Sequence, residues 1–258
     1  MPFSCARKML ICSLIFCFTG QSFADGPWKL RKDKHNIQVY TKDVEGSSYN
    51  AVKTTTFVEG VSLSAAVALI TDVESCTEWA PNCAKSYVYK EISETESLVY
   101  TDNDMPFPVS DRDVLSRVAW HQDPQTYEVT MTSQATVDIL APVKGKLRLT
   151  EANAGWTFTP LGHGKIMVTN QAHINPGSSL PGWVTNMLLV STPYETMKAF
   201  TKQVKKPKYQ NVSISFIHEK PEKVAETIES AEAPLAEKAK AQQQEPRDAS
   251  NKKTEIQL

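Results

Sequence analysis

The sequence lacks the features that mark several classes of protein. Lys and Arg number 28 against 29 Asp and Glu in 258 residues, so no excess of positive charge draws the chain onto nucleic acid. Glycine is scarce, with 10 residues, which excludes a collagen-like repeat. A hydrophobic content of 41% excludes a wholly disordered chain. The composition is that of a globular protein with one large domain or two small ones.

Patterns that carry catalysis or metal binding are also missing from the sequence. It has no glycine-rich phosphate loop, no paired carboxylates and no Ser-His-Asp order of a nucleophilic enzyme. The five histidines show no ligand spacing, so no tetrahedral metal site is complete. We expect no metal, no cofactor and no enzymatic activity.

The longest apolar run lies near the N-terminus and is too short to cross a bilayer. It covers residues 9–18, whereas a spanning helix needs about 20 residues. Basic residues precede it, and Ser22 and Ala24 place small side chains where a signal peptidase reads. We therefore expect a signal peptide at residues 1–24 and export to a periplasm or out of the cell.

Removal of the expected signal peptide changes how many cysteines are left to form a disulfide. Three of the five leave with it, and Cys76 and Cys83 remain with six residues between them. An even pair in an oxidising compartment predicts a local disulfide. The alternative is a pair of reduced, buried thiols.

The C-terminal end differs in composition from the rest of the chain. From about residue 219 it consists mainly of Glu, Lys, Ala and Gln, with interrupting prolines and no aromatic residue. Such a segment cannot bury a core. We assign residues 25–208 to the working domain and residues 209–258 to a charged tail, disordered or partly helical.

Hydrophobic periodicity within residues 25–208 predicts an α+β domain. We expect a helical turn at 27–32 and a helix at 62–73 with Ser62 as its cap. Strands are expected at residues 37–43, 49–58, 86–92, 97–101, 112–121, 126–135, 143–150, 156–159 and 165–174. Short turns between consecutive strands indicate an antiparallel meander, because parallel neighbours need long crossovers.

A long helical segment follows the strands. It starts near Pro181, and Pro193 should kink or split it near Ser191. Its apolar residues recur at spacings of three and four: Trp183, Met187, Val190, Tyr194, Met197, Phe200 and Val204. The pattern predicts a curved antiparallel sheet wrapped around this long C-terminal helix.

Several motifs in this order resemble the START family of StAR-related lipid-transfer domains, whose fold is called the helix-grip. Residues 78–82 are similar to its Trp-x-Pro stretch, and residues 108–114 are similar to its Arg-Asp motif at the start of a central strand. Residues 156–160 resemble its late strand, and residues 175–183 resemble the start of its last helix. The resemblance covers about residues 27–205 and rests on the joint order of the motifs.

The resemblance implies a non-enzymatic domain that binds, and transfers, a lipid of the sterol, fatty acid or phospholipid class in an apolar tunnel. The lipid would enter where the final helix meets a loop between two central strands, during transient contact with a membrane surface. The matching loop is 136–142, with Val137, Ile139 and Leu140 as portal residues. The alternative is a loop that simply packs on the domain.

Candidate ligand-binding side chains lie on the inward faces of the strands and of the final helix. Nearly all are long and apolar, and Asn170 and Tyr194 are the polar groups expected to orient a headgroup. The set is Val118, Trp120, Tyr127, Val129, Met131, Leu147, Leu149, Trp156, Phe158, Ile166, Val168, Asn170, Trp183, Met187, Val190 and Tyr194. For each of them, core packing is the alternative.

Three further residues, Trp79, Arg112 and Asp113, are assigned structural roles. Arg112 should pair with a rim acid, while Asp113 points away from it along the strand. Some sterol-binding members carry a buried arginine six residues beyond the Arg-Asp arginine. Here that position is Val118, and Arg117 should face the other way, which argues against this sterol contact.

Two rival functions remain open at this point. The wider helix-grip superfamily includes cyclases and hydrolases, so an enzyme is one alternative to lipid binding. A structural or partner-binding domain is the other. The sequence sets no oligomeric state.

Overall fold

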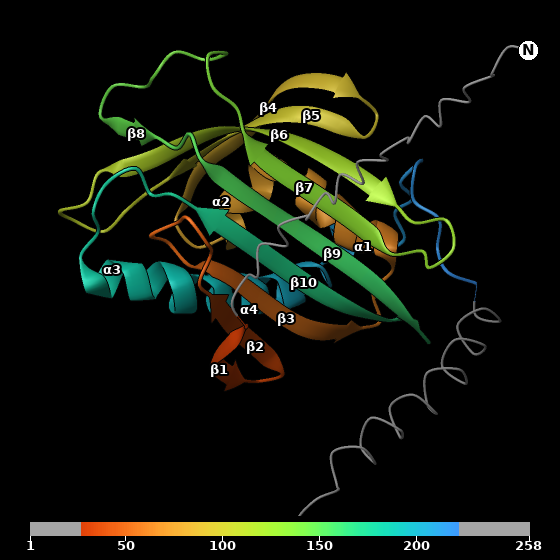
Figure 1. Ribbon diagram of the computed structural model, residues 1–258. Helices are drawn as coiled ribbons and strands as arrows, with labels where there is room; N and C mark the ends of the chain where they lie inside the picture. The colour runs from red at the N-terminus through yellow and green to blue at the C-terminus, as the bar shows by residue number, and fades with distance from the viewer. Residues whose placement is uncertain (1–26, 222–258) are drawn as a thin grey trace, which may run out of the picture.

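The computed structural model describes residues 27–221 (Figure 1). The expected signal peptide and the tail beyond residue 221 lie outside this part. The strands form one sheet in the order β1-β2-β3-β10-β9-β7-β6-β5-β4, in which all neighbours are antiparallel, and β8 lies parallel to β6 off this path. Together with the long C-terminal helix, this sheet confirms the helix-grip fold.

After β1, the elements follow the predicted order of two strands, a helix, a long meander of strands and a final helix. The strands are β1 (Lys29–Lys34), β2 (Ile37–Lys42), β3 (Ala51–Glu59), β4 (Cys83–Ser93), β5 (Glu96–Asn103), β6 (Asp111–Gln122), β7 (Val129–Ala135), β8 (Lys146–Arg148), β9 (Ala152–Gly162) and β10 (Lys165–Ile174). The helices and short helical turns are α1 (Leu63–Thr71), η1 (Val73–Ser75), α2 (Cys76–Trp79), α3 (Gly182–Asn186), η2 (Met187–Ser191), α4 (Thr192–Gln203) and η3 (Pro207–Tyr209).

The expected helical turn at residues 27–32 is wrong, because this stretch forms strand β1. His35 and Asn36, which join β1 to β2, both have positive φ, 54° and 59°. Two such residues make the tight hairpin turn whose twist matches that of paired strands. Pairing with β2 supplies the backbone hydrogen bonds that a single helical turn would leave open.

Two expected strands are shorter in the structure than the sequence suggests. The stretch at 143–150 keeps only β8, which pairs parallel to the start of β6. Gly145 has a φ of 86°, and the chain turns before β8 begins. The stretch at 126–135 begins as a strand only at Val129, because Tyr127 has a φ of 61° in the preceding turn.

The helices begin and end as their caps and prolines predict. The Ser62 hydroxyl accepts a hydrogen bond of 3.0 Å from the Ala65 amide and so caps α1. The final helical segment is interrupted at η2, a π-helical turn that ends just before Pro193. Proline lacks an amide hydrogen and its ring crowds the preceding turn. The helical backbone continues through this π turn, so the irregularity lies where it was expected but the helix is not split.

A closed core fills the space between α4 and the middle of the sheet. Phe158 of β9 stacks on Phe200 of α4 with ring centroids 5.9 Å apart, and Trp156 lies 5.2 Å from the same ring. The buried part of the domain also continues past the expected boundary at residue 208. Tyr209 and Ile217 are buried in this core, so residues 209–221 pack on the domain.

Candidate ligand-binding cavity

A cavity of about 480 Å³ lies between one half of the sheet and the helices that cover it. Its floor is the inner face of β4 to β7 together with single residues of β9 and β10. Its cover consists of the C-terminal end of α1, then η1 and α2, and Thr196 of α4. The volume falls within the range of about 300–1,000 Å³ that is usual for small-molecule sites.

Period-two alternation along β6 decides which side chains reach this cavity. Val114, Ser116, Val118 and Trp120 all line it. Arg117, on the opposite face, is exposed and pairs with Glu96 on β5. The expectation that Val118 points inward and Arg117 outward is therefore met.

Three tryptophans from different elements form much of the apolar wall. Trp79 comes from α2, Trp120 from β6 and Trp156 from β9. Met131 of β7 lies between the last two, because it pairs with Trp120 on one side and Trp156 on the other. Indole and thioether groups give a wide apolar surface that suits rings or acyl chains.

The expected ligand-binding residues separate into three groups in the structure. Those that line the cavity are Val118, Trp120, Met131, Trp156 and Asn170. Those in the closed core are Val129, Phe158, Ile166, Val168 and Tyr194. The others, Tyr127, Leu147, Leu149, Trp183, Met187 and Val190, do not line the cavity, and Trp183 is 55% exposed. Regular helical spacing predicted that Trp183 faces inward. The π turn between α3 and α4 breaks that spacing, so residues of α3 do not continue the inward stripe of α4.

Of the two expected polar groups, only Asn170 faces the cavity. Its side-chain amide donates a 3.0 Å hydrogen bond to the Gly155 carbonyl on β9. Tyr194 is buried elsewhere, with its hydroxyl 2.8 Å from Nδ1 of His35 in the β1–β2 turn and Lys32 over its ring. Tyr194 therefore fixes the N-terminal hairpin on α4 and is not placed to orient a ligand in this cavity.

Sequence reasoning missed the hydroxyl groups of the cavity. Ser97, Ser116 and Ser133 lie on three adjacent strands and line its floor. When hydrophobicity alone assigns the two faces of a strand, polar residues such as these serines are placed on the solvent-facing side. Counting back by two from Val118 would have placed Ser116 on the inward face. Trp79, assigned a structural role, also lines the cavity.

The expected disulfide between Cys76 and Cys83 is present and belongs to the cavity wall. It joins the start of α2 to the start of β4. Asn82, beside it, donates a 3.4 Å hydrogen bond to the Thr192 hydroxyl on α4. The backbone carbonyl of Asn82 accepts a 2.8 Å hydrogen bond from Asp104 after β5. These contacts close the cavity on the side of α4.

The most exposed lining residues lie on the opposite side, where α1 ends and β4 turns into β5. They include Thr71, Glu91 and Glu94. Asp72, at the end of α1, accepts hydrogen bonds from Tyr209 (2.8 Å) and Lys208 (3.1 Å). Partial burial raises the pKa of Asp72, but these hydrogen bonds outweigh it and hold that pKa below its usual value.

The Arg-Asp motif has a structural part in this fold. Arg112 is buried and donates to the Ser110 carbonyl and to the Ser178 hydroxyl. The expected ion pair between Arg112 and a rim acid is not among the ion pairs of residues 27–221. Asp113 faces the other side of the sheet, as expected, where it pairs with Arg148.

The expected portal loop lies over the outer face of the sheet. Leu140 packs against Leu98, Tyr100 and Leu115 there, and residues 136–142 do not line the cavity. Val137 and Ile139 stay exposed at the tip of the loop. The β5–β6 loop, residues 104–110, lies at the same end of the strands as the β7–β8 loop. It carries Phe107, which is 93% exposed. The Met-Pro-Phe-Pro sequence was a signal that sequence reasoning did not use.

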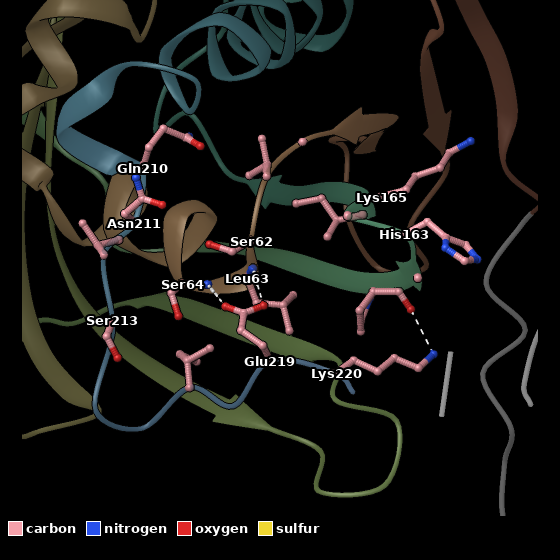
Figure 2. A pocket seen from close by; sticks show the side chains of 18 residues that line it. Ser62, Leu63, Ser64, His163, Lys165, Gln210, Asn211, Ser213, Glu219 and Lys220 are labelled. Carbon is pink, nitrogen blue, oxygen red and sulfur yellow. Dashed lines mark hydrogen bonds between the residues drawn. The ribbon is translucent and has the colours of Figure 1, made fainter. Parts of the chain in front are cut away.

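A second cavity of about 700 Å³ lies at the start of α1, between the β9–β10 turn and residues 210–220 (Figure 2). The Glu219 carboxylate occupies its centre and accepts hydrogen bonds from the amides of Leu63 (3.0 Å) and Ser64 (2.8 Å). Lys220 donates a 3.2 Å hydrogen bond to the Pro160 carbonyl. Because the helix amides already hold an internal carboxylate and many wall groups are polar, we take the first cavity as the candidate ligand site.

A curved sheet that closes on a helix around a mostly apolar cavity defines a helix-grip domain for a hydrophobic small molecule. The sequence model of the START domain family matches residues 22–210, so the chain belongs to this family. Among residues 27–221, no helix is long and apolar enough to cross a membrane, and no three acidic, His or Cys residues gather as a metal site.

Known relatives agree with this assignment. A solved STAR-related lipid transfer protein fragment from Xanthomonas axonopodis is 32% identical, with a TM-score of 0.63 over 69% of this chain and 99% of that chain. The crystal structure of human STARD10 is 20% identical with a TM-score of 0.63, over 71% and 75% of the chains, and supports the fold alone. An uncharacterized protein of Pseudomonas aeruginosa is 29% identical over 78% of this chain and 97% of its own.

Proposed function

We propose that this START domain binds one hydrophobic lipid in the cavity over β4 to β7 and carries it between membranes without chemical change. The observation that carries the proposal is the wall formed by Trp79, Trp120, Trp156 and Met131 around a space of about 480 Å³. The name of the Xanthomonas relative, a lipid transfer protein, supports the same function.

Burial of the lipid's carbon atoms supplies the affinity. Each methylene transferred from water to an apolar site contributes about 0.8 kcal/mol. The accessible lining of the cavity is mostly apolar, so apolar contact supplies most of the affinity. A carrier needs no more than this, whereas an enzyme also needs a base or nucleophile held by an orienting partner.

A matched pair of variants tests the site. Ser133 lines the cavity and Thr132, the preceding residue of β7, is exposed on the outer face. We expect Ser133→Trp to fill the cavity and reduce uptake of a fluorescent lipid at least tenfold, while Thr132→Trp leaves uptake unchanged. Equal uptake by both folded variants, checked by thermal melting, would place the ligand elsewhere.

Membrane contact is assigned to the end of the sheet where the β5–β6 loop, the β7–β8 loop and α3 come together (Figure 1). Phe107, Val137, Ile139 and Trp183 are exposed there. Apolar side chains on loop tips cost free energy in water and gain it in the interfacial region of a bilayer. Of the three expected portal residues, Val137 and Ile139 take the docking role in this proposal, whereas Leu140 packs against the outer face of the sheet.

Vesicle flotation tests this contact. Phe107→Asp combined with Ile139→Asp should lower the bound fraction several-fold. Phe57→Asp is the control, because Phe57 is exposed at the other end of the sheet, on β3. If the control and the double variant float equally, the loops are not the contact surface.

The proposed function includes export of the protein from the cytoplasm. A chain cleaved after Ala24 would work in a periplasm or outside the cell, where the Cys76–Cys83 disulfide is stable. N-terminal sequencing of protein from that compartment should start at Asp25. A retained leader, or protein found with the cytoplasmic fraction, contradicts this part.

A further inference from the structure

The charges around the lipid cavity are all of one sign. Its lining within residues 27–221 includes four acidic residues, Asp72, Glu91, Glu94 and Glu96, and no Lys, Arg or His. They lie at the open side, where α1 ends and β4 turns into β5. The carboxylates of two of them pair away from the cavity, Asp72 with Lys208 and Glu96 with Arg117 on the outer face of the sheet.

Such a cavity disfavours an anionic headgroup both at its rim and in its interior. At the rim, the headgroup would lie beside Glu91 and Glu94, which have no ion pair in the described part of the chain. Once inside, it would be a charge without a counter-charge in an apolar site, which is far costlier than an uncharged polar group. A free fatty acid or an anionic phospholipid headgroup therefore has no partner there.

The interior does offer partners for an uncharged polar group. Ser97, Val118 and Ser133 are cross-strand neighbours on β5, β6 and β7, so the two hydroxyls flank Val118 on the cavity floor. Ser116, one step along the same face of β6, adds a third. None of these hydroxyls makes a side-chain hydrogen bond within residues 27–221, unlike Ser86, which bonds the Tyr100 carbonyl.

The cover of the cavity also carries a free donor. Trp79 of α2 lines the cavity, and its indole Nε1 is buried without an acceptor in the described part of the chain. A buried donor without a partner costs free energy, which a ligand oxygen recovers. A hydroxyl group suits the whole set, because it accepts from Trp79 or from a serine and donates to another serine.

We propose that the ligand is an uncharged lipid alcohol, whose hydroxyl is held by Ser116 and Ser133 and whose hydrocarbon lies against Trp120 and Trp156. The inference rests on the proposed lipid-binding function and narrows it to one chemical class. The acidic rim then acts as a filter that keeps anionic lipids out, and the serines act as the specificity-determining residues.

Two probes that differ in one functional group test the filter. Oleyl alcohol and sodium oleate share a chain, and each is titrated at neutral pH into delipidated protein, residues 25–258, with tryptophan fluorescence as the readout. We expect the alcohol to bind at least tenfold more tightly than the carboxylate. Equal or tighter binding of the carboxylate overturns the inference and leaves the lipid-binding function standing. Failure of both probes to bind contradicts the proposed function itself.

A positive charge introduced into the cavity provides a second test. Ser133→Lys places a cation among the lining residues, while Thr132→Lys places the same cation on the outer face. We expect Ser133→Lys to reverse the preference toward oleate and Thr132→Lys to leave it unchanged. If Ser133→Lys fails to fold, Ser116→Ala with Ser133→Ala replaces it and should weaken the alcohol several-fold while hexadecane binding is unchanged. An unaltered preference in the folded variant overturns the assignment of the serines.

Discussion

Arg148 donates two hydrogen bonds to the Asp113 carboxylate, of 3.0 Å from Nε and 2.8 Å from Nη2. Asp113 is fully buried beneath the β7–β8 loop. The same guanidinium donates to the Leu140 carbonyl at 2.9 Å. Tyr100 donates to Asp113 as well, and burial and this carboxylate together raise the pKa of Tyr100. The pair therefore anchors the loop on the outer face, while Val137 and Ile139 at its tip stay exposed.

Breaking this ion pair should cost more than breaking an exposed one. Asp113→Asn leaves Arg148 without its counter-charge, so we expect the free energy of unfolding to fall by about 3 kcal/mol. Glu96→Gln removes the partner of the exposed Arg117 and should cost less than about 1 kcal/mol. Urea unfolding at neutral pH measures both, and equal losses would contradict the buried role of Asp113.

The disulfide gives a prediction for protein taken from its native compartment. Intact mass before and after reduction and alkylation should show two thiols protected by the Cys76–Cys83 bond. Replacement of both cysteines by serine should lower the stability by roughly 2–4 kcal/mol, since the unfolded chain loses a cross-link. Free thiols in the native protein would remove the claim.

The segment after α4 should be needed for a stable domain. Tyr209 and Ile217 are buried, and Glu219 caps α1. A chain that ends at residue 208 should melt well below one that ends at residue 221, because each lost apolar side chain contributes about 1.5–3 kcal/mol. Glu219→Ala in the longer chain should cost about 1 kcal/mol through loss of the cap, while exposed Glu195→Ala is the control. Equal melting of the two chain lengths would show that the segment does not stabilise the domain.

Acid should loosen the contact between α1 and the segment after α4. Because the pKa of folded Asp72 lies below its usual value, the carboxylate stabilises the fold above about pH 4, and that stability is lost as the pH falls through the folded pKa. Wild-type protein should therefore lose more stability between about pH 5 and pH 2 than Asp72→Asn does. Exposed Glu45→Gln serves as the control and should follow the wild type. Identical pH curves for Asp72→Asn and wild type would contradict the contact.

Local sequence patterns were enough to predict the strands and helices that have one buried face. Strand β10 has the bounds expected for residues 165–174, and α1 begins after the Ser62 cap as expected. Period two and a capping hydroxyl are properties of a few consecutive residues, which a sequence displays directly.

The site needed information that no local pattern holds. The inward positions Ser116 and Ser133 carry hydroxyls because they face a cavity, so the rule that inward means apolar failed there. Tyr194 fits the apolar stripe of the final helix, yet its hydroxyl meets His35, 159 residues away. Which inward side chains enclose a space and which fill a core is set by packing between distant elements.

Native mass spectrometry of protein purified from its native compartment, with organic extraction of its ligand, shows whether the cavity over β4 to β7 holds a lipid. We expect one lipid per chain, released unchanged and identified in the extract as an uncharged molecule with a hydroxyl group. An empty protein that also takes up no fluorescent sterol, fatty acid or phospholipid would contradict lipid binding by this cavity.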